Sequence, residues 1–156
     1  MSPTGTPGAT EGDDFLGVQV YTRMLVGPNG PVAYPRGART TLMGYEFWPE
    51  ALEACLRRAW EVTGGLPLLV TENGIGTADD AERIEYVERA LQGVLRALAD
   101  GLDVRGYTYW SAFDNFEWAF GYRPTFGLVA VDRSTQVRTP KPSAVWLGQI
   151  AARNSL

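Results

Sequence analysis

The sequence of 156 residues contains no histidine and only one cysteine, Cys55. Without histidine the chain cannot build a Ser-His-Asp or Cys-His catalytic site, or the usual zinc sites. A single cysteine cannot form a disulfide within the chain, which fits a reducing compartment, and we expect a cytoplasmic protein. Cys55 lies in an apolar helical pattern, so we expect it to be buried filler. We expect no metal and no cofactor, so carboxylates, tyrosine, lysine or arginine must carry any chemistry.

Other absences narrow the class of protein further. The net charge is −4 and there is no run of basic residues, which argues against a nucleic-acid partner. No stretch approaches the roughly 18 apolar residues of a membrane span. The first residues contain no basic region followed by an apolar one, so no signal peptide is visible. We therefore expect neither nucleic acid nor a membrane among the partners.

Aromatic residues are plentiful, with five Trp and seven Tyr. Their flat apolar faces serve either core packing or stacking against a sugar ring. Composition alone favours core packing.

The chain alternates between strand and helix patterns. Residues 1–13 are rich in Gly, Pro, Thr and Ser and predict a disordered tail, followed by one folded region over residues 14–153. Apolar runs and turn signals predict strands at 15–21, 66–71 and 104–110, with a short strand-like segment at 127–132. Helical spacing predicts helices from Pro49 to Gly64, from a capping box at Thr77 to Gly101, and over 142–153, with a long aromatic loop over 111–126.

This order indicates parallel βα units in an α/β fold. In a parallel α/β barrel the catalytic groups stand at the carboxyl ends of the strands. Three predicted strands end on candidate residues, namely Tyr21, Glu72 and Trp110. By position alone, Glu72 could equally be a solvated loop carboxylate or an acidic residue beside a helix.

Three local strings carry a family resemblance. Residues 68–74 read LLVTENG, residues 109–118 read YWSAFDNFEW and are followed by Gly121-Tyr122, and residues 14–22 read DFLGVQVYT. Together, in this order, they resemble the β-glucosidase family, glycoside hydrolase family 1. The four letters TENG alone would be weak. The resemblance implies the C-terminal part of a (β/α)8 TIM barrel, about three βα units of eight.

The same resemblance implies a retaining double-displacement mechanism. By this resemblance, Glu72 is the nucleophile that forms a glycosyl-enzyme intermediate, and Tyr21 orients it and keeps it ionised. The substrate would be a β-glucoside or an oligosaccharide.

The resemblance also implies a set of substrate-binding residues. Trp110 forms the platform under the sugar ring, and Glu117 and Trp118 hold its outer hydroxyls. Phe126 completes the implied set. A carboxylate at Glu117 would repel a sugar phosphate, so an unphosphorylated sugar is expected. We expect this sugar to be glucose, with galactose and fucose as the alternatives.

The sequence also departs from the family. Gln19 and Val20 stand where the family usually has Asn and Tyr; Gln can still donate and accept hydrogen bonds. No TxNEP-like string is present, so the acid/base glutamate is missing from these 156 residues, and a complete barrel needs roughly 250 residues.

Three hypotheses share these motifs: part of a β-glucosidase-type enzyme, an inactive remnant or pseudoenzyme, and a subunit completed by an N-terminal polypeptide. An adjacent upstream reading frame with an NEP motif would favour a split or frameshifted enzyme over a remnant.

Overall fold

The computed structural model describes residues 10–156. Most of the predicted tail, residues 1–9, lies outside the described residues. Residues 10–13 form a turn in which the Asp13 amide donates to the Thr10 carbonyl at 3.2 Å.

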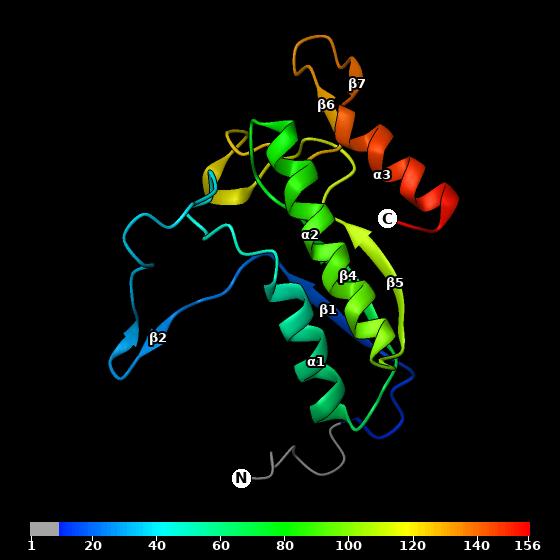
Figure 1. The fold of residues 1–156 in the computed structure, drawn as a ribbon. Coiled ribbons are helices and arrows are strands. Elements are labelled where there is room, and N and C mark those ends of the chain that lie inside the picture. Colours follow the sequence, from blue (N-terminus) through cyan, green and yellow to red (C-terminus); the bar gives the residue numbers. More distant parts are fainter. Residues whose placement is uncertain (1–9) are drawn as a thin grey trace.

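Three parallel strands form the central sheet in the order β1–β4–β5 (Figure 1). Their bounds are Leu16–Val20 for β1, Leu68–Asn73 for β4 and Val104–Tyr109 for β5. The three predicted strands are therefore confirmed, with ends shifted by one or two residues. Strands that follow one another in the chain are neighbours in the sheet, as expected for successive βα units.

Three helices accompany these strands, and their bounds are Ala51–Thr63 for α1, Asp80–Ala99 for α2 and Pro142–Arg153 for α3. Gly64 ends α1 in the left-handed conformation. The predicted capping box at Thr77 is wrong, because Asp79 caps α2 by accepting from the Ala81 amide. Within residues 10–156 no helix combines the length and apolar character needed to cross a membrane.

The core lies between the sheet and the helices α1 and α2, which cover one face of it (Figure 1). Leu52 and Leu56 of α1 and Leu68 and Val70 of β4 are fully buried there. Burying each such side chain contributes about 1.5–3 kcal/mol. The alternation along β4 leaves Leu69 on the other face of the sheet.

The sequence offers Val18, Leu69 and Tyr107 as candidates for the inner face of the barrel, and two of them lie on the opposite side. Val18 and Tyr107 both pack in the core with the helices. Because side chains alternate along a strand, an error of one residue in the predicted pattern moves a side chain to the opposite face. The third candidate, Leu69, does lie on the open face. A Cβ on Gly106 would come within 2.6 Å of the Leu69 side chain, so small neighbours make room for Leu69 there.

Cys55 is exposed, so the prediction that it is buried is wrong. Leu52 and Leu56 occupy the covered face of α1, and Cys55 lies on its flank. The buried stripe of α1 is therefore one residue narrower than predicted, because a flank position is covered only where a neighbouring helix packs against it.

Shorter elements surround this unit. They are the strand pairs Val26–Gly27 (β2) with Gly30–Pro31 (β3) and Val129–Val131 (β6) with Arg138–Pro140 (β7), and the 3-10 helix Trp118–Phe120 (η1). The predicted strand-like segment over 127–132 contains β6. Its antiparallel partner β7 was not predicted, because three exposed residues carry no alternation.

Among residues 10–156, β1 and β5 each pair only with β4, so the sheet has two open edges. We expect the 156-residue chain alone to self-associate, aggregate or form a molten state, because open edges and exposed apolar side chains promote association. Met24, Val26 and Trp118 are 70%, 68% and 85% exposed. Light scattering and a thermal melt test this expectation. A monodisperse monomer with a sharp, cooperative transition would contradict it.

Candidate active site

The three strand ends meet at one pocket of about 250 Å³. Tyr21 follows β1, Glu72 lies near the end of β4 and Trp110 follows β5. The structure brings together all six candidate residues, and the pocket is lined by Tyr21, Met43, Tyr45, Glu72, Trp110, Glu117, Trp118 and Phe126. The convergence follows from the parallel sheet, which places the carboxyl ends of its strands at one edge.

Two side chains hold the Glu72 carboxylate: Gln19, which belongs to β1, and Tyr21, which follows it. The Tyr21 hydroxyl donates to Oε2 at 2.6 Å, and Gln19 Nε2 donates to Oε1 at 2.9 Å. Gln19 and Glu72 are partners across the parallel ladder, next to a register shift after Val18. Gln19 was not predicted as a site residue. Its spacing of two from Tyr21, which puts both side chains on one side of a strand, was the available signal.

Tyr21 remains a hydrogen-bond donor over a wide pH range. Burial first, and then its hydrogen bond to the Glu72 carboxylate, raise the pKa of Tyr21 well above its usual value. The phenol therefore stays protonated where an exposed tyrosine would titrate, at about pH 10. Its ring packs edge-on against Phe126, with the ring centroids 6.0 Å apart.

Buried polar side chains next to Glu72 fix the backbone at the end of β1. Asn73 is fully buried; its Nδ2 donates to the Val20 carbonyl at 2.7 Å, and its Oδ1 accepts from the Tyr107 hydroxyl at 2.9 Å. The Tyr86 hydroxyl donates to the Tyr21 carbonyl at 2.8 Å. Because buried polar groups are costly to leave unpaired, these bonds hold the two strand ends in one arrangement.

Glu117 is the second carboxylate of the pocket and is 9% exposed. Its Oε1 accepts from Trp110 Nε1 at 3.2 Å and from Asn115 Nδ2 at 2.6 Å. These bonds join the aromatic loop to the end of β5. Gly74 permits the close approach of β4 to this loop, since a Cβ there would lie 2.0 Å from the Trp110 carbonyl oxygen.

Trp118 presents an open aromatic face at the mouth of the pocket. It is 85% exposed and adopts a positive φ of 46° at the start of η1. The turn is held by the Glu117 amide, which donates to the Gly121 carbonyl at 2.7 Å. An exposed indole beside a carboxylate suits a ligand with an apolar face and hydroxyl groups.

Met43 and Tyr45 line the same pocket and were missed by sequence reasoning. They belong to a turn in which the Thr41 amide donates to the Tyr45 carbonyl at 2.8 Å, with Gly44 at a φ of 76°. This segment has no periodicity that marks it as part of a site.

Arg83 of α2 ties together the loops that carry the site, and it is 1% exposed. Its guanidinium donates to the carbonyls of Ile75, Thr77, Thr125 and Phe126 at 2.9–3.0 Å. It also donates to the Tyr109 hydroxyl at 3.0 Å and to Asp80 at 2.8 Å. This one side chain therefore joins the loop after β4 to the segment that positions Phe126.

The arrangement can perform carboxylate chemistry on a polyhydroxylated ring. Glu72 is oriented by two donors, Glu117 offers hydrogen-bond acceptors, and Trp110 and Trp118 offer apolar faces. Among residues 10–156 no group of three or more His, Cys, Asp or Glu side chains is placed to hold a metal ion.

Comparison with known proteins agrees with this picture. A family model described as glycosyl hydrolase family 1 matches residues 14–156. The bifunctional β-D-glucosidase/β-D-fucosidase of Bifidobacterium breve is 42% identical over 91% of this chain and 38% of its own length. The 1,4-β-D-glucan glucohydrolase of Thermotoga neapolitana is 36% identical over 92% of this chain and 35% of its own.

Solved structures share the fold closely. The β-glycosidase BGL167 is 56% identical, with a TM-score of 0.88 over 93% of this chain and 34% of that one. The β-glucosidase from Thermotoga maritima in complex with deoxynojirimycin is 34% identical, with a TM-score of 0.86 over 92% and 35%. These neighbours are TIM barrels, and this chain spans about a third of their length.

Proposed function

Because the chain belongs to glycosyl hydrolase family 1, we propose that it supplies the nucleophile side of a retaining β-glycosidase that hydrolyses terminal, non-reducing β-D-glucosyl residues. The observation that carries this proposal is the Glu72 carboxylate, held by Tyr21 and Gln19 at adjoining strand ends in a pocket that also contains Glu117, Trp110 and Trp118.

In this mechanism Glu72 attacks the anomeric carbon and the glycosidic oxygen leaves, which forms a covalent glycosyl-enzyme intermediate. Tyr21 and Gln19 each donate to one carboxylate oxygen. They hold the carboxylate in one orientation, and each oxygen keeps a lone pair free for attack. Water then cleaves the intermediate with retention of configuration.

The sugar would stack on Trp110 and be held at its outer hydroxyls by Glu117 and Trp118. A carboxylate can accept from two neighbouring hydroxyls, which suits a diol, and it would repel a phosphorylated sugar. This supports an unphosphorylated glycone. Glucose is our first choice, with galactose and fucose as the alternatives.

The proton donor must come from the remainder of the barrel. Retaining enzymes place their two carboxyl groups about 5–5.5 Å apart and need one of them as acid and base. Glu117 is the other acidic residue of the pocket, and its Oε1 is already committed to Trp110 and Asn115. We therefore assign Glu117 to binding.

The 156-residue chain by itself is expected not to hydrolyse unactivated β-glucosides such as cellobiose. Acid/base groups typically contribute about 10²–10⁴-fold to the rate. Glucose release by the purified chain is the measurement. Turnover that disappears in a Glu72→Gln variant would contradict the expectation.

In a completed barrel, a 2-fluoro-glucoside with a good leaving group should label Glu72 covalently. The fluorine disfavours the oxocarbenium-like transition state, and the leaving group accelerates the first step, so the intermediate accumulates. Peptide mapping by mass spectrometry locates the label. A label on Glu117, or on any other residue, would refute the assignment of the nucleophile.

A second candidate function is sugar binding without catalysis, as in a remnant or pseudoenzyme. The aromatic faces and Glu117 favour it, since they can bind a sugar without a proton donor. Adding the N-terminal part of a family member separates the two candidates, because restored hydrolysis requires a competent Glu72 whereas binding alone does not.

A further inference from the structure

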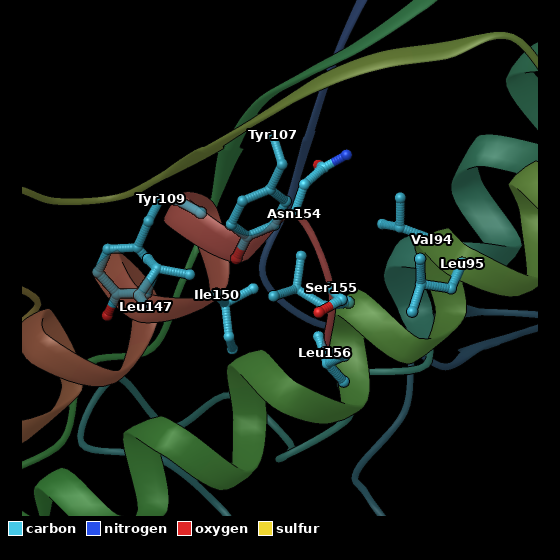
Figure 2. A pocket seen from close by; sticks show the side chains of 11 residues that line it. Val94, Leu95, Tyr107, Tyr109, Leu147, Ile150, Asn154, Ser155 and Leu156 are labelled. Carbon is cyan, nitrogen blue, oxygen red and sulfur yellow. The ribbon is translucent and has the colours of Figure 1, made fainter.

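A larger cavity, of about 450 Å³, lies between α2, α3 and β5, and it is poorly suited to a sugar (Figure 2). Most of its lining is apolar, and its two tyrosine hydroxyls are already used: Tyr107 donates to Asn73 and Tyr109 to the Phe126 carbonyl, each at 2.9 Å. The acceptors that sugar hydroxyls need lie in the smaller active-site pocket, where Glu117 provides a carboxylate.

The Glu117 carboxylate is held through one of its two oxygens. Oε1 accepts from Asn115 Nδ2 at 2.6 Å and from Trp110 Nε1 at 3.2 Å. Among residues 10–156 no group donates to the other oxygen, Oε2, and that atom is not sealed from solvent. A ligand in the pocket can therefore reach Oε2, while the two donors on Oε1 set the direction in which the carboxylate points.

Asn115 is itself oriented by a further hydrogen bond. Its Oδ1 accepts from the Ser111 hydroxyl at 3.0 Å, and the same hydroxyl lies 2.7 Å from the Phe113 carbonyl oxygen. An ionised carboxylate can only accept, so the amide nitrogen of Asn115 must face Glu117 and the amide oxygen must face Ser111. The amide thus has one chemically consistent orientation, in which both of its ends are used.

The loop beside Asn115 is fixed by contacts that do not involve Glu117. Asp114 Oδ1 accepts from Lys141 Nζ and from the Gly127 amide, each at 2.8 Å. Removing the Asn115 side chain should therefore leave the loop in place, and its effect should fall on the direction of the Glu117 carboxylate.

We propose that Asn115 is a positioning residue for sugar binding: it holds Glu117 Oε1 so that Oε2 points at the sugar hydroxyls in the pocket. The inference rests on the proposed function in one respect, the assignment of Glu117 to hydroxyl binding. Asn115 does not line the pocket, so it acts through Glu117 and not by touching the sugar.

The test uses the completed barrel, formed by this chain and the part of β-glycosidase BGL167 that this chain does not match. Every sample carries Glu72→Gln to prevent turnover. Calorimetry measures the Kd of para-nitrophenyl β-D-glucoside at about pH 5 and about pH 8, on either side of the titration expected of two carboxyl groups in contact.

Asn115→Asp places a carboxyl group where the amide was, directly against Glu117. At about pH 8 both carboxyl groups are ionised and repel each other, so Kd should rise about tenfold or more above that of the parent. At about pH 5 the pair shares one proton, which restores a hydrogen bond to Oε1, and Kd should return to within about threefold of the parent. Recovery at the lower pH also shows that the variant is folded.

Two further variants isolate this effect. Asn115→Ala removes the donor without adding a charge, so its Kd should rise about tenfold at both pH values. Asn29→Asp makes the same chemical change in the exposed β2–β3 turn and should bind as the parent does. The titratable groups near Glu117, which include Tyr21, Asp114 and Lys141, are common to all samples, so the ratio of Kd to that of the parent cancels their titration.

Three results would overturn the proposal: a Kd for Asn115→Asp that matches the parent at the higher pH, a loss that is the same at both pH values, or a parent barrel that binds no glucoside. Hydrolysis by the barrel with Glu72 restored is measured in parallel. Normal hydrolysis together with an unaffected Kd in Asn115→Asp contradicts the role of Asn115 alone. The expected pH response without hydrolysis supports that role and contradicts the proposed catalytic function.

Discussion

A Glu72→Gln variant of the completed barrel is expected to lose on the order of 10⁴-fold or more in kcat/KM for a β-glucoside, as is usual when a covalent nucleophile is removed. The amide has nearly the same shape as the carboxylate, so Tyr21 and Gln19 keep a partner at this position. It cannot attack the anomeric carbon, however. The loss should appear in kcat, while substrate still binds. Steady-state kinetics on an aryl β-glucoside measure it.

Glu117→Gln is the matched control for this experiment. It makes the same chemical change in the same pocket, at a carboxylate that already accepts from Trp110 and Asn115. If Glu117 binds hydroxyls, as proposed, this variant should mainly raise KM, with a far smaller fall in kcat. If Glu117→Gln abolished kcat while Glu72→Gln retained it, the two assignments would have to be exchanged.

Arg83→Met is expected to lower the free energy of unfolding by about 3–5 kcal/mol, the usual cost of removing one partner of a buried ion pair. Arg83 is 1% exposed, and methionine fills much of its volume without donating a hydrogen bond. The carbonyls of Thr77 and Thr125 would lose their guanidinium donor, and Asp80 would lose its charged partner. Pulse proteolysis of the completed barrel in urea measures the change.

Arg58→Met provides the comparison. Arg58 pairs with Glu61 at 2.8 Å, but both side chains are well exposed, so the substitution should change the free energy of unfolding by about 0.5 kcal/mol or less. Equal effects at the two positions would mean that Arg83 is not a structural tie. Removing the Arg83 guanidinium should also disturb the active-site pocket, because Arg83 holds the segment that carries Phe126.

Much of this fold and site could be predicted from local sequence. The apolar runs that became β1, β4 and β5 and the periodic stretches that became α1 and α2 are short-range patterns, and Gly64 ended its helix as expected. Carboxyl ends of parallel strands must share an edge, so the sequence alone predicts that Glu72, Tyr21 and Trp110 lie together. The motifs around Glu72 and Trp110 then identified the family.

What remained undetermined depends on register and on neighbours distant in the chain. The pairing of Gln19 with Glu72 follows a register shift after Val18, and no string of residues encodes that shift. The same kind of one-position ambiguity placed Val18 on the wrong face. Cys55 is exposed because nothing in residues 10–156 covers its flank of α1.

Arg83 shows the difference most clearly. In the sequence it is one charged residue in an amphipathic helix, where a solvated position is the ordinary expectation. In the structure four backbone carbonyls converge on it, two from the loop that leads into α2 and two from the aromatic loop, 42 and 43 residues away in the chain. Sequence alone therefore determined the elements and the chemical groups at their ends, since both depend on short-range pattern. Tertiary structure decided which of those groups meet, because burial and hydrogen bonding are properties of contacts between distant segments.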